Sequence, residues 1–503
     1  MRLPAILRPG VQDLLLLVGL ISLLTVQLSG IADDPGVGWH LKTGEIILTQ
    51  ETVPHHDPFL AAPAPRPWIA DQWLGDVILA SLYHLGGWSL LAGVVTGVFL
   101  GTWFGVLYLG GIRLGLPPLL LSFGTILAFK LGQVHFLIRP VIFGFPLFAV
   151  TTVLLFSLRR PHTTSRGRRL FLLPPLFLLW TNLHPSFTLG LLLIWLLPAA
   201  LLLEQGHRVV RDPLFRNALA AALLAALVTL INPYGFALHR SIFALGAEPF
   251  FMNFHQEWRS PDLTRFEGQL FLLTGALLLV ALFLERAPRS CRLFELLTVA
   301  TFGALSLDAV RVLPFFGLVV TIPLIRMVSR SRGLARVCRA ADKVNRWEAG
   351  ASQGRLILTV VLPLLIVWPL LTGHLPGVRT IPAPDASKFP WGAVDYLRSV
   401  ATPAAPVTVI ASPDWGGFIT WHGGGHVRPV IDDRNTLLGA DFYRHFLTAM
   451  RPEGAWTRYV QELEGTHILL SPRGALHHVV RTNPSFQLVY EDGIGIVFAR
   501  IES

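Results

Sequence analysis

The chain has 503 residues, of which 52% are hydrophobic and only 14% are charged, and its mean hydropathy is +0.56. Soluble domains carry about a quarter charged residues, so this composition excludes an ordinary soluble protein and indicates a membrane protein. The formal net charge of +10 is typical of some nucleic-acid-binding proteins. Here, however, the arginines form short clusters between apolar runs, as the positive-inside rule requires, and we expect no nucleic-acid partner.

The first apolar run, residues 11–30, follows two basic residues, Arg2 and Arg8. A cleaved signal peptide and a retained first helix share this charge pattern. We favour a retained helix with its N-terminus in the cytoplasm, because many apolar runs follow. The chain then emerges outside into residues 31–87, a stretch far longer than most connections between helices.

Further apolar runs each approach the roughly 20 residues that cross a hydrocarbon core. They lie at 88–111, 117–135, 139–158, 169–183, 186–204, 216–233, 267–285, 293–308, 310–327 and 355–375. With the first run they predict about eleven transmembrane helices.

Basic clusters occupy alternate loops between these runs, at 159–169, 208–216, 286–292 and 326–346. The positive-inside rule places them in the cytoplasm. Cys291 and Cys338 lie in or beside them, so we expect no disulfide. An odd number of spans then leaves the C-terminal tail outside the cytoplasm.

The tail changes composition sharply and contains short runs typical of strands, with amphipathic stretches between them. The predicted strands lie at 407–410, 467–470, 487–490 and 495–498, and the amphipathic stretches at 439–450 and 453–464. We therefore predict an α-helical polytopic membrane protein. Its transmembrane domain, 1–375, carries a large first external loop, 31–87, and is followed by a small extracytoplasmic α/β domain, 376–503.

Polar residues collect on the predicted outer face, opposite the basic loops. Ionisable groups at membrane depth are costly, and they indicate a substrate path or site. The candidate substrate-binding residues are His40, Asp57, Asp71, Trp73, Arg139, Asn182, His184, Asn232, Tyr234, Glu257, Trp258 and Arg311.

Each of these features also has a structural interpretation. Asp33 and Asp34 precede Pro35 and fit a helix cap or a turn. His55 and His56 have metal-ligand chemistry, but neighbouring side chains point in different directions, so this pair offers one ligand rather than a complete site. Tryptophans of the first loop are typical interfacial anchors, and arginines reach lipid headgroups as readily as a lipid-linked phosphate.

Several motifs resemble a large group of bacterial polytopic proteins related to the GT-C glycosyltransferases. In the first loop these are DDPGVGWHL from Asp33 to Leu41, Asp57-Pro58-Phe59, and Trp68 with Gln72-Trp73-Leu74. Further motifs are Trp180-Thr181-Asn182-Leu183-His184, Asn232-Pro233-Tyr234-Gly235, Glu257-Trp258, Arg311 with Pro314-Phe315-Phe316, Trp415-Gly416-Gly417-Phe418, Ile431-Asp432-Asp433-Arg434 and Tyr490-Glu491-Asp492.

The resemblance implies an enzyme that uses a polyprenyl-phosphate sugar, of the dolichyl-phosphate-mannose mannosyltransferase kind. In such enzymes an acidic residue just after the first helix is the catalytic base or a metal ligand, a role that falls here on Asp33 or Asp34. Arg139 and Arg311 are then candidates for offsetting charge on the departing phosphate. The resemblance also allows a divalent metal ion, Mg²⁺ or Mn²⁺, with His55 and His56 as candidate ligands.

Three functions remain open at this point. The first is an inverting glycosyltransferase of the bacterial inner membrane, which transfers a sugar to a glycan, lipid or protein acceptor of the envelope. The second is a non-catalytic assembly or export component for envelope polysaccharide. The third, a transporter, ranks last, because the sequence has few ionisable residues near the middle of a span and no internal repeat.

Overall fold

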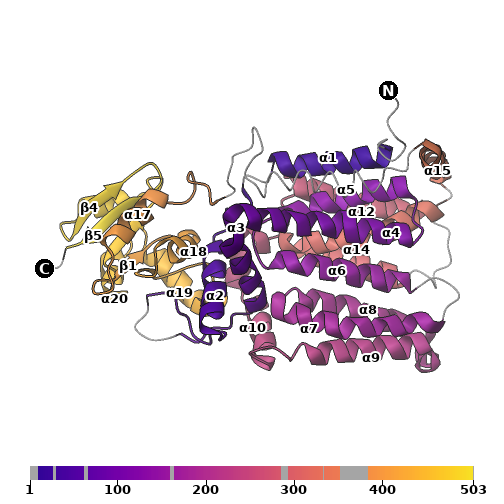
Figure 1. Cartoon of the computed structure of the whole chain (residues 1–503), viewed down its shortest axis with the longest axis horizontal. Helices are drawn as coiled ribbons and strands as arrows, with labels where there is room; N and C mark the ends of the chain where they lie inside the picture. Colours follow the sequence, from indigo (N-terminus) through magenta and orange to yellow (C-terminus); the bar gives the residue numbers. More distant parts are fainter. Residues whose placement is uncertain are drawn as a thin grey trace.

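The computed structural model describes residues 10–26, 30–61, 66–158, 164–284, 293–331, 333–351 and 383–501. The predicted span 355–375, the predicted domain boundary after residue 375, and Cys291 lie outside these ranges. The described chain forms a stack of long helices that run side by side, with a smaller unit containing a β-sheet against one end of the stack (Figure 1).

Apolar helices occupy every predicted span from 11–30 to 310–327. They are α1 (Val11–Val26), α3 (Trp73–Leu100) with the π-helix Gly101–Tyr108 and α4 (Leu109–Arg113), α5 (Pro118–Gly132), α6 (Val141–Ser157), α7 (Leu173–Leu183), α8 (Phe187–Gln205), α9 (Pro213–Val228), α12 (Phe266–Leu284), α13 (Leu293–Asp308) and α14 (Leu313–Arg330). Four continuous stretches of the described chain are long and apolar enough to cross a bilayer, namely 73–113, 187–211, 266–284 and 310–330. The chain is thus a multi-pass membrane protein.

Two helices show how the stack is arranged. Every residue of α14 from Leu313 to Ile325 is buried, as expected for a helix that is apolar all round and lies at the centre of a bundle. On α12, by contrast, Leu279 and Phe283 are 69% and 87% exposed. Such exposure on a long apolar helix fits contact with lipid.

The first external loop is more helical than the sequence predicted. It contains α2 (Val37–Gln50), and α3 begins at Trp73 rather than at residue 88. The apolar pattern at 88–111 did not show this extension, because α3 kinks at Gly86 and Gly87, where Gly87 has φ +61°. A backbone bond from the Ile138 amide to the Ile31 carbonyl, 2.8 Å, holds the loop against the turn before α6.

The C-terminal unit is the predicted α/β structure. Its sheet has the order β2-β1-β3-β5-β4, with β1 parallel to β2 and β3, and β5 antiparallel to β3 and β4. The elements are α17 (Trp391–Val400), β1 (Val407–Ile410), α18 (Pro413–His422), β2 (Val427–Pro429), α19 (Asn435–Ala449), α20 (Trp456–Glu462), β3 (His467–Leu470), α21 (Leu476–Arg481), β4 (Phe486–Glu491) and β5 (Ile496–Arg500). The predicted strands are confirmed, whereas β2 was not foreseen because it is only three residues long.

The two parts of the molecule meet closely, where α18 crosses α2. A Cβ atom on Gly38 would lie 2.0 Å from the Gly417 carbonyl oxygen, so only glycine allows this approach. Next to it, the Trp421 ring of α18 lies 5.1 Å from the Trp88 ring of α3. The glycines of the Trp415-Gly416-Gly417 motif lie in α18, where Gly417 forms this contact and Gly416 packs against the backbone of Ile431.

Candidate active site

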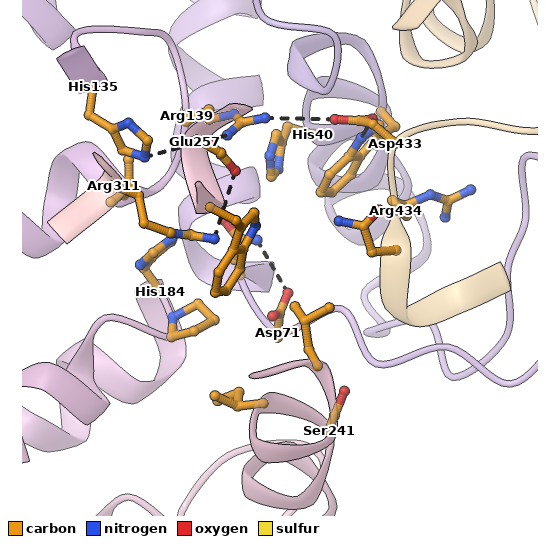
Figure 2. A pocket seen from close by; sticks show the side chains of 18 of the residues that line it. His40, Asp71, His135, Arg139, His184, Ser241, Glu257, Arg311, Asp433 and Arg434 are labelled. Carbon is orange, nitrogen blue, oxygen red and sulfur yellow. Dashed lines mark hydrogen bonds and ion pairs between the residues drawn. The ribbon is translucent and has the colours of Figure 1, made fainter. Parts of the chain in front are cut away.

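A cavity of about 170 Å³ lies where the C-terminal unit meets the end of the helical stack (Figure 2). Its walls come from α2, the segments before α3 and α6, the turn before α8, helix α10 (Phe236–Gly246), the two short turns Gln256–Trp258 and Val310–Val312, and the loop after β2. The lining residues are Trp39, His40, Trp68, Asp71, Gln72, His135, Arg139, Val141, His184, Pro185, Ser241, Ile242, Leu245, Glu257, Trp258, Arg311, Asp433, Arg434 and Asn435.

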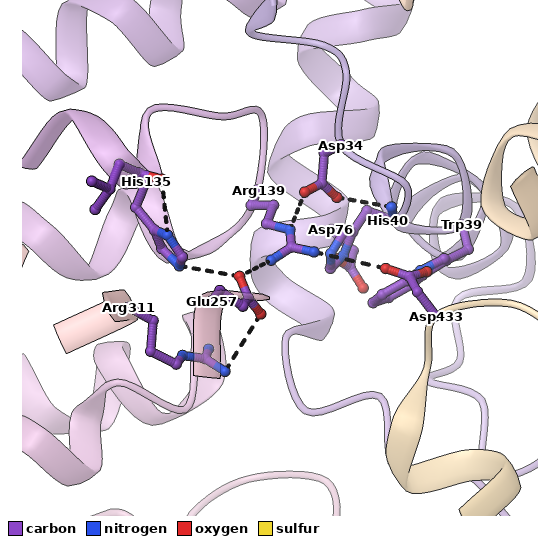
Figure 3. Close-up of polar contacts among 11 residues, drawn as sticks. Asp34, Trp39, His40, Asp76, His135, Arg139, Glu257, Arg311 and Asp433 are labelled. Carbon is purple, nitrogen blue, oxygen red and sulfur yellow. Dashed lines mark hydrogen bonds and ion pairs between the residues drawn. The ribbon is translucent and has the colours of Figure 1, made fainter. Parts of the chain in front are cut away.

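Arg139 lies at the centre of a charge network that joins three separate parts of the chain (Figure 3). Its guanidinium is in direct contact with Asp34, which is buried and also accepts a bond from the Gly36 amide at 2.8 Å. It donates to Glu257 at 2.9 Å and lies 3.7 Å from Asp433 of the C-terminal unit. The Trp39 indole donates to the other oxygen of Asp433 at 2.7 Å. Arg139 thus ties the first loop and the C-terminal unit to the helical stack.

A second arginine reaches the same network from the segment before α14. Arg311 lies 3.7 Å from Glu257, and its guanidinium stacks over the Trp258 ring at 4.0 Å from the ring centre. A backbone bond from Val310 to the Arg259 carbonyl, 2.9 Å, fixes the two turns together. Burial alone would raise the pKa of Glu257, but Arg139 and Arg311 hold it below its usual value. Glu257 is therefore an ionised bridge between two guanidinium groups.

His184 offers a neutral donor to the cavity. Burial and the nearby Arg311 hold its pKa well below the usual value, so the ring is uncharged at neutral pH. The Ser186 amide donates to its Nδ1 at 2.9 Å, in the break that Pro185 makes between α7 and α8. A neutral ring that accepts at Nδ1 carries its proton on Nε2, so His184 presents an Nε2–H group.

Two carboxyl groups on the cavity have raised pKa values. Burial raises the pKa of Asp71 to about 6. Burial, with the Asp34 charge next in importance, raises the pKa of Asp433 to about 7. Perturbed carboxyl groups that face a cavity are typical of functional sites.

Arg434, next to Asp433, holds the loop after β2 in place. It pairs with Asp57 at 2.8 Å and with Asp432 at 2.7 Å, and it stacks 4.6 Å from the centre of the Trp68 ring. Asp57 also accepts bonds from the backbone of its own turn. Asp57, predicted to bind substrate, therefore serves in this structure to attach the C-terminal unit to the first loop.

The structure brings most of the predicted charged residues together. His40, Asp71, Arg139, His184, Glu257, Trp258 and Arg311 all line the cavity. Asp34 lies directly behind Arg139, whereas Asp33 turns away to pair with Lys388 at 2.7 Å and to accept a bond from the Asp385 amide.

The remaining candidates lie elsewhere. Trp73, Asn182 and Asn232 line a separate surface groove, where the Trp73 indole donates to Asn182 at 3.0 Å. The Tyr234 hydroxyl links the Pro54 carbonyl and the Ala70 amide, which fixes the fold of the first loop. Roles in substrate binding for these residues stay predictions.

The acidic groups around Arg139 do not form a metal site. Asp34, Glu257 and Asp433 converge as metal ligands would, but the Arg139 guanidinium lies between them and provides the positive charge. Among the described residues, no group of three or more histidine, cysteine, aspartate or glutamate side chains is arranged to hold a metal ion. His55 and His56 are exposed on the first loop, and a metal site there stays a prediction.

Several lining residues were not among the sequence candidates. The polar ones from outside the first loop are His135, Ser241, Asp433, Arg434 and Asn435. The Asp432-Asp433-Arg434 motif was visible in the tail, but nothing in the sequence indicates that this motif reaches the membrane-embedded part. The crossing of α18 over α2 and the pairing of Arg434 with Asp57 bring it there.

No family model and no curated protein matches this chain. Among solved structures, it is similar to the archaeal oligosaccharyltransferase AglB from Archaeoglobus fulgidus, in complex with an inhibitory peptide and a dolichol-phosphate. That match has 11% identity and a TM-score of 0.55, and covers 98% of this chain and 74% of the other. It is also similar to ArnT from Cupriavidus metallidurans bound to undecaprenyl phosphate, with 14% identity and a TM-score of 0.52, over 97% of this chain and 98% of the other.

Identities this low show the fold alone. AglB is an oligosaccharyltransferase solved with a dolichol-phosphate, ArnT was solved with undecaprenyl phosphate, and both have the GT-C fold. The resemblance of the sequence motifs implied this fold, and the structural match over nearly the whole chain confirms the fold. The described chain therefore has the GT-C fold, with a cavity between its helical stack and its C-terminal unit.

Proposed function

We propose that this protein is an integral membrane glycosyltransferase. It transfers a sugar from a polyprenyl-phosphate-linked donor to a glycan, lipid or protein acceptor, with inversion at the anomeric carbon. The observation that carries the proposal is the cavity at the end of a stack of apolar helices with the GT-C fold. Its walls hold the guanidinium groups of Arg139 and Arg311, the neutral His184 donor, and several carboxyl groups.

The charges suit a lipid-linked phosphate. As the bond between the anomeric carbon and the phosphate oxygen breaks, negative charge grows on the departing phosphate. Arg311 and Arg139 offer charged donors, and His184 offers its Nε2–H. Arginine forks match phosphate oxygens well. The stacking of Arg311 on Trp258 fixes the orientation of its donors before the substrate arrives.

The arrangement also suits a substrate with one polar end and one apolar end. The cavity lies at the end of apolar helices, so a polyprenyl chain in the bilayer would present its phosphate there. The amphipathic, basic helix α15 (Ala335–Ala351) lies at the opposite end of the stack (Figure 1). By the positive-inside rule that end is cytoplasmic, and the cavity is extracytoplasmic, on the outer face of a bacterial inner membrane.

Purified protein in lipid nanodiscs tests this function. It would be given radiolabelled undecaprenyl-phosphate hexoses and pentoses together with an envelope extract as acceptor. We expect transfer of label from at least one donor, and saturable binding of undecaprenyl phosphate by the wild type. Binding without transfer from any donor would favour a non-catalytic assembly component, and absence of both would reject a site for lipid-linked sugars.

A further inference from the structure

Asp71 differs from the other acidic groups around the cavity. It lies just before α3, where Gln72 occupies the cap position, and its carboxylate accepts a bond from the Gln72 side chain at 3.3 Å. No described arginine, lysine or histidine forms an ion pair with it within 4.0 Å. Figure 2 shows it on the same cavity as Arg311 and His184.

The other acidic groups are already engaged. Asp34 is in contact with Arg139, accepts from the Gly36 amide, and is not part of the cavity wall. Glu257 bridges Arg139 and Arg311. Asp433 accepts from the Trp39 indole and faces Arg139. A group that removes a proton needs an accessible, basic lone pair, which pairing with a guanidinium reduces.

We propose that Asp71 is the general base of the transfer reaction and that Asp34 is a positioning residue for Arg139. This inference rests on the glycosyltransferase function proposed above. The acceptor hydroxyl or amine forms a bond to the anomeric carbon, while the bond from that carbon to the phosphate oxygen breaks. The electron pair of the broken bond leaves with the polyprenyl phosphate, and the acceptor proton passes to a carboxylate oxygen of Asp71.

The ionisation of Asp71 gives this assignment a signature. Since burial raises the pKa of Asp71 to about 6, the group is ionised at neutral pH and becomes protonated as the pH falls through that value. A base must be ionised, so kcat/KM falls on the acid side of about pH 6. The titratable and charged groups around the cavity and beside Asp71 are His40, Asp76, His135, Arg139, His184, Tyr234, Glu257, Arg311, Asp433 and Arg434.

The test compares Asp71→Asn and Asp34→Asn in nanodiscs, with Asp71→Glu as the conservative variant and Glu51→Gln as a control. Glu51 is an exposed acid on the same loop. Undecaprenyl phosphate is the binding probe, and label transfer from the donor that the wild type uses is the activity. We expect Asp71→Asn to lower kcat at least a hundredfold, within the usual range of about 10²–10⁴ for a general base, with binding of the probe within twofold.

The two positions differ in further readouts. Asp71→Glu should restore part of the activity. The residual kcat/KM of Asp71→Asn should no longer fall below about pH 6, whereas kcat/KM of Asp433→Asn should still fall there. Asp34→Asn should weaken probe binding and thermal stability through Arg139. A structural role of Asp71 at the start of α3 would instead lower the yield of folded protein, with kcat per folded molecule unchanged, and would overturn the proposal.

Two other outcomes distinguish failure of this inference from failure of the proposed glycosyltransferase function. In the first, the wild type transfers label, Asp71→Asn is as active as the wild type, and Asp34→Asn loses kcat while it binds the probe fully. That result would assign the role of base to Asp34 and would leave the proposed glycosyltransferase function standing. A wild type that neither binds the probe nor transfers label would overturn both proposals together.

Discussion

Arg139 contacts three carboxylates from three distant segments, and this determines what its substitution does. Arg139→Met would leave Asp34, Glu257 and Asp433 close together without a positive charge. Removing one partner from a buried pair typically costs about 3–5 kcal/mol. We expect a loss of stability of that size, seen as a lower unfolding temperature in detergent. The double variant Arg139→Met, Asp34→Asn should be more stable than Arg139→Met alone, because it removes one of the unpaired carboxylates. If the losses of stability of the two single variants simply add, the two residues do not interact as the network requires.

Arg311 depends on its shape as well as its charge. Arg311→Lys keeps the charge but loses the planar group stacked on Trp258 at 4.0 Å. Such a cation–π contact, open to solvent, contributes about 0.5–1 kcal/mol, so we expect binding of undecaprenyl phosphate to weaken by about twofold to fivefold. Titration of the probe into protein in nanodiscs measures this. Arg265→Lys, on an exposed arginine outside the cavity, should bind as the wild type does.

At the scale of elements, the crossing of α2 and α18 holds the C-terminal unit in place. Glycine is required there, because a Cβ on Gly417 would lie 2.2 Å from the Pro35 carbonyl oxygen. Gly417→Ala should therefore destabilise the protein by about 1–3 kcal/mol, as overpacking usually does. It should also weaken binding of undecaprenyl phosphate, because Asp433 and Asn435 would shift relative to the helical stack.

Differential scanning fluorimetry in detergent measures the stability, and the same probe titration measures the binding. Gly275→Ala provides the matched control, because nothing lies within 4 Å of the added Cβ on α12. If Gly417→Ala and Gly275→Ala lower the unfolding temperature by the same small amount, α2 and α18 can move apart at little cost.

For the whole molecule, the proposed orientation places the cavity and the C-terminal unit outside the cytoplasm. In a Cys291→Ser, Cys338→Ser background, a single cysteine replaces either Glu453 or Arg346. Both positions are exposed, the first in the C-terminal unit and the second on α15. A membrane-impermeant maleimide should label Glu453→Cys in intact cells, and Arg346→Cys only after permeabilisation. The reverse pattern would place the site in the cytoplasm.

The sequence by itself determined the helical stack and most of the strands. A helix that crosses the bilayer needs about 20 consecutive apolar residues, and a strand shows as a short run of β-branched residues. Both patterns involve only neighbouring residues, so helices and strands can be predicted without knowledge of the tertiary structure. The positions of α5, α6, α8 and β3 follow directly from this. The kink at Gly86 and Gly87 was missed because a glycine pair does not by itself indicate whether a helix bends or ends.

The candidate site was only partly predictable. The sequence identified Arg139, Glu257 and Arg311 because charged residues between apolar runs are conspicuous. It did not show that Asp433 joins them, since that contact depends on how α18 packs on α2.

Nor did the sequence distinguish the acids of the first loop from one another. Asp33 pairs with Lys388, Asp34 with Arg139, and Asp71 with no cation of the described chain. Residue type and spacing are the same whether a carboxylate is paired or free, whereas its reactivity depends on the charges that surround it. Tertiary structure alone decided those charges, because they come from segments far apart in the sequence.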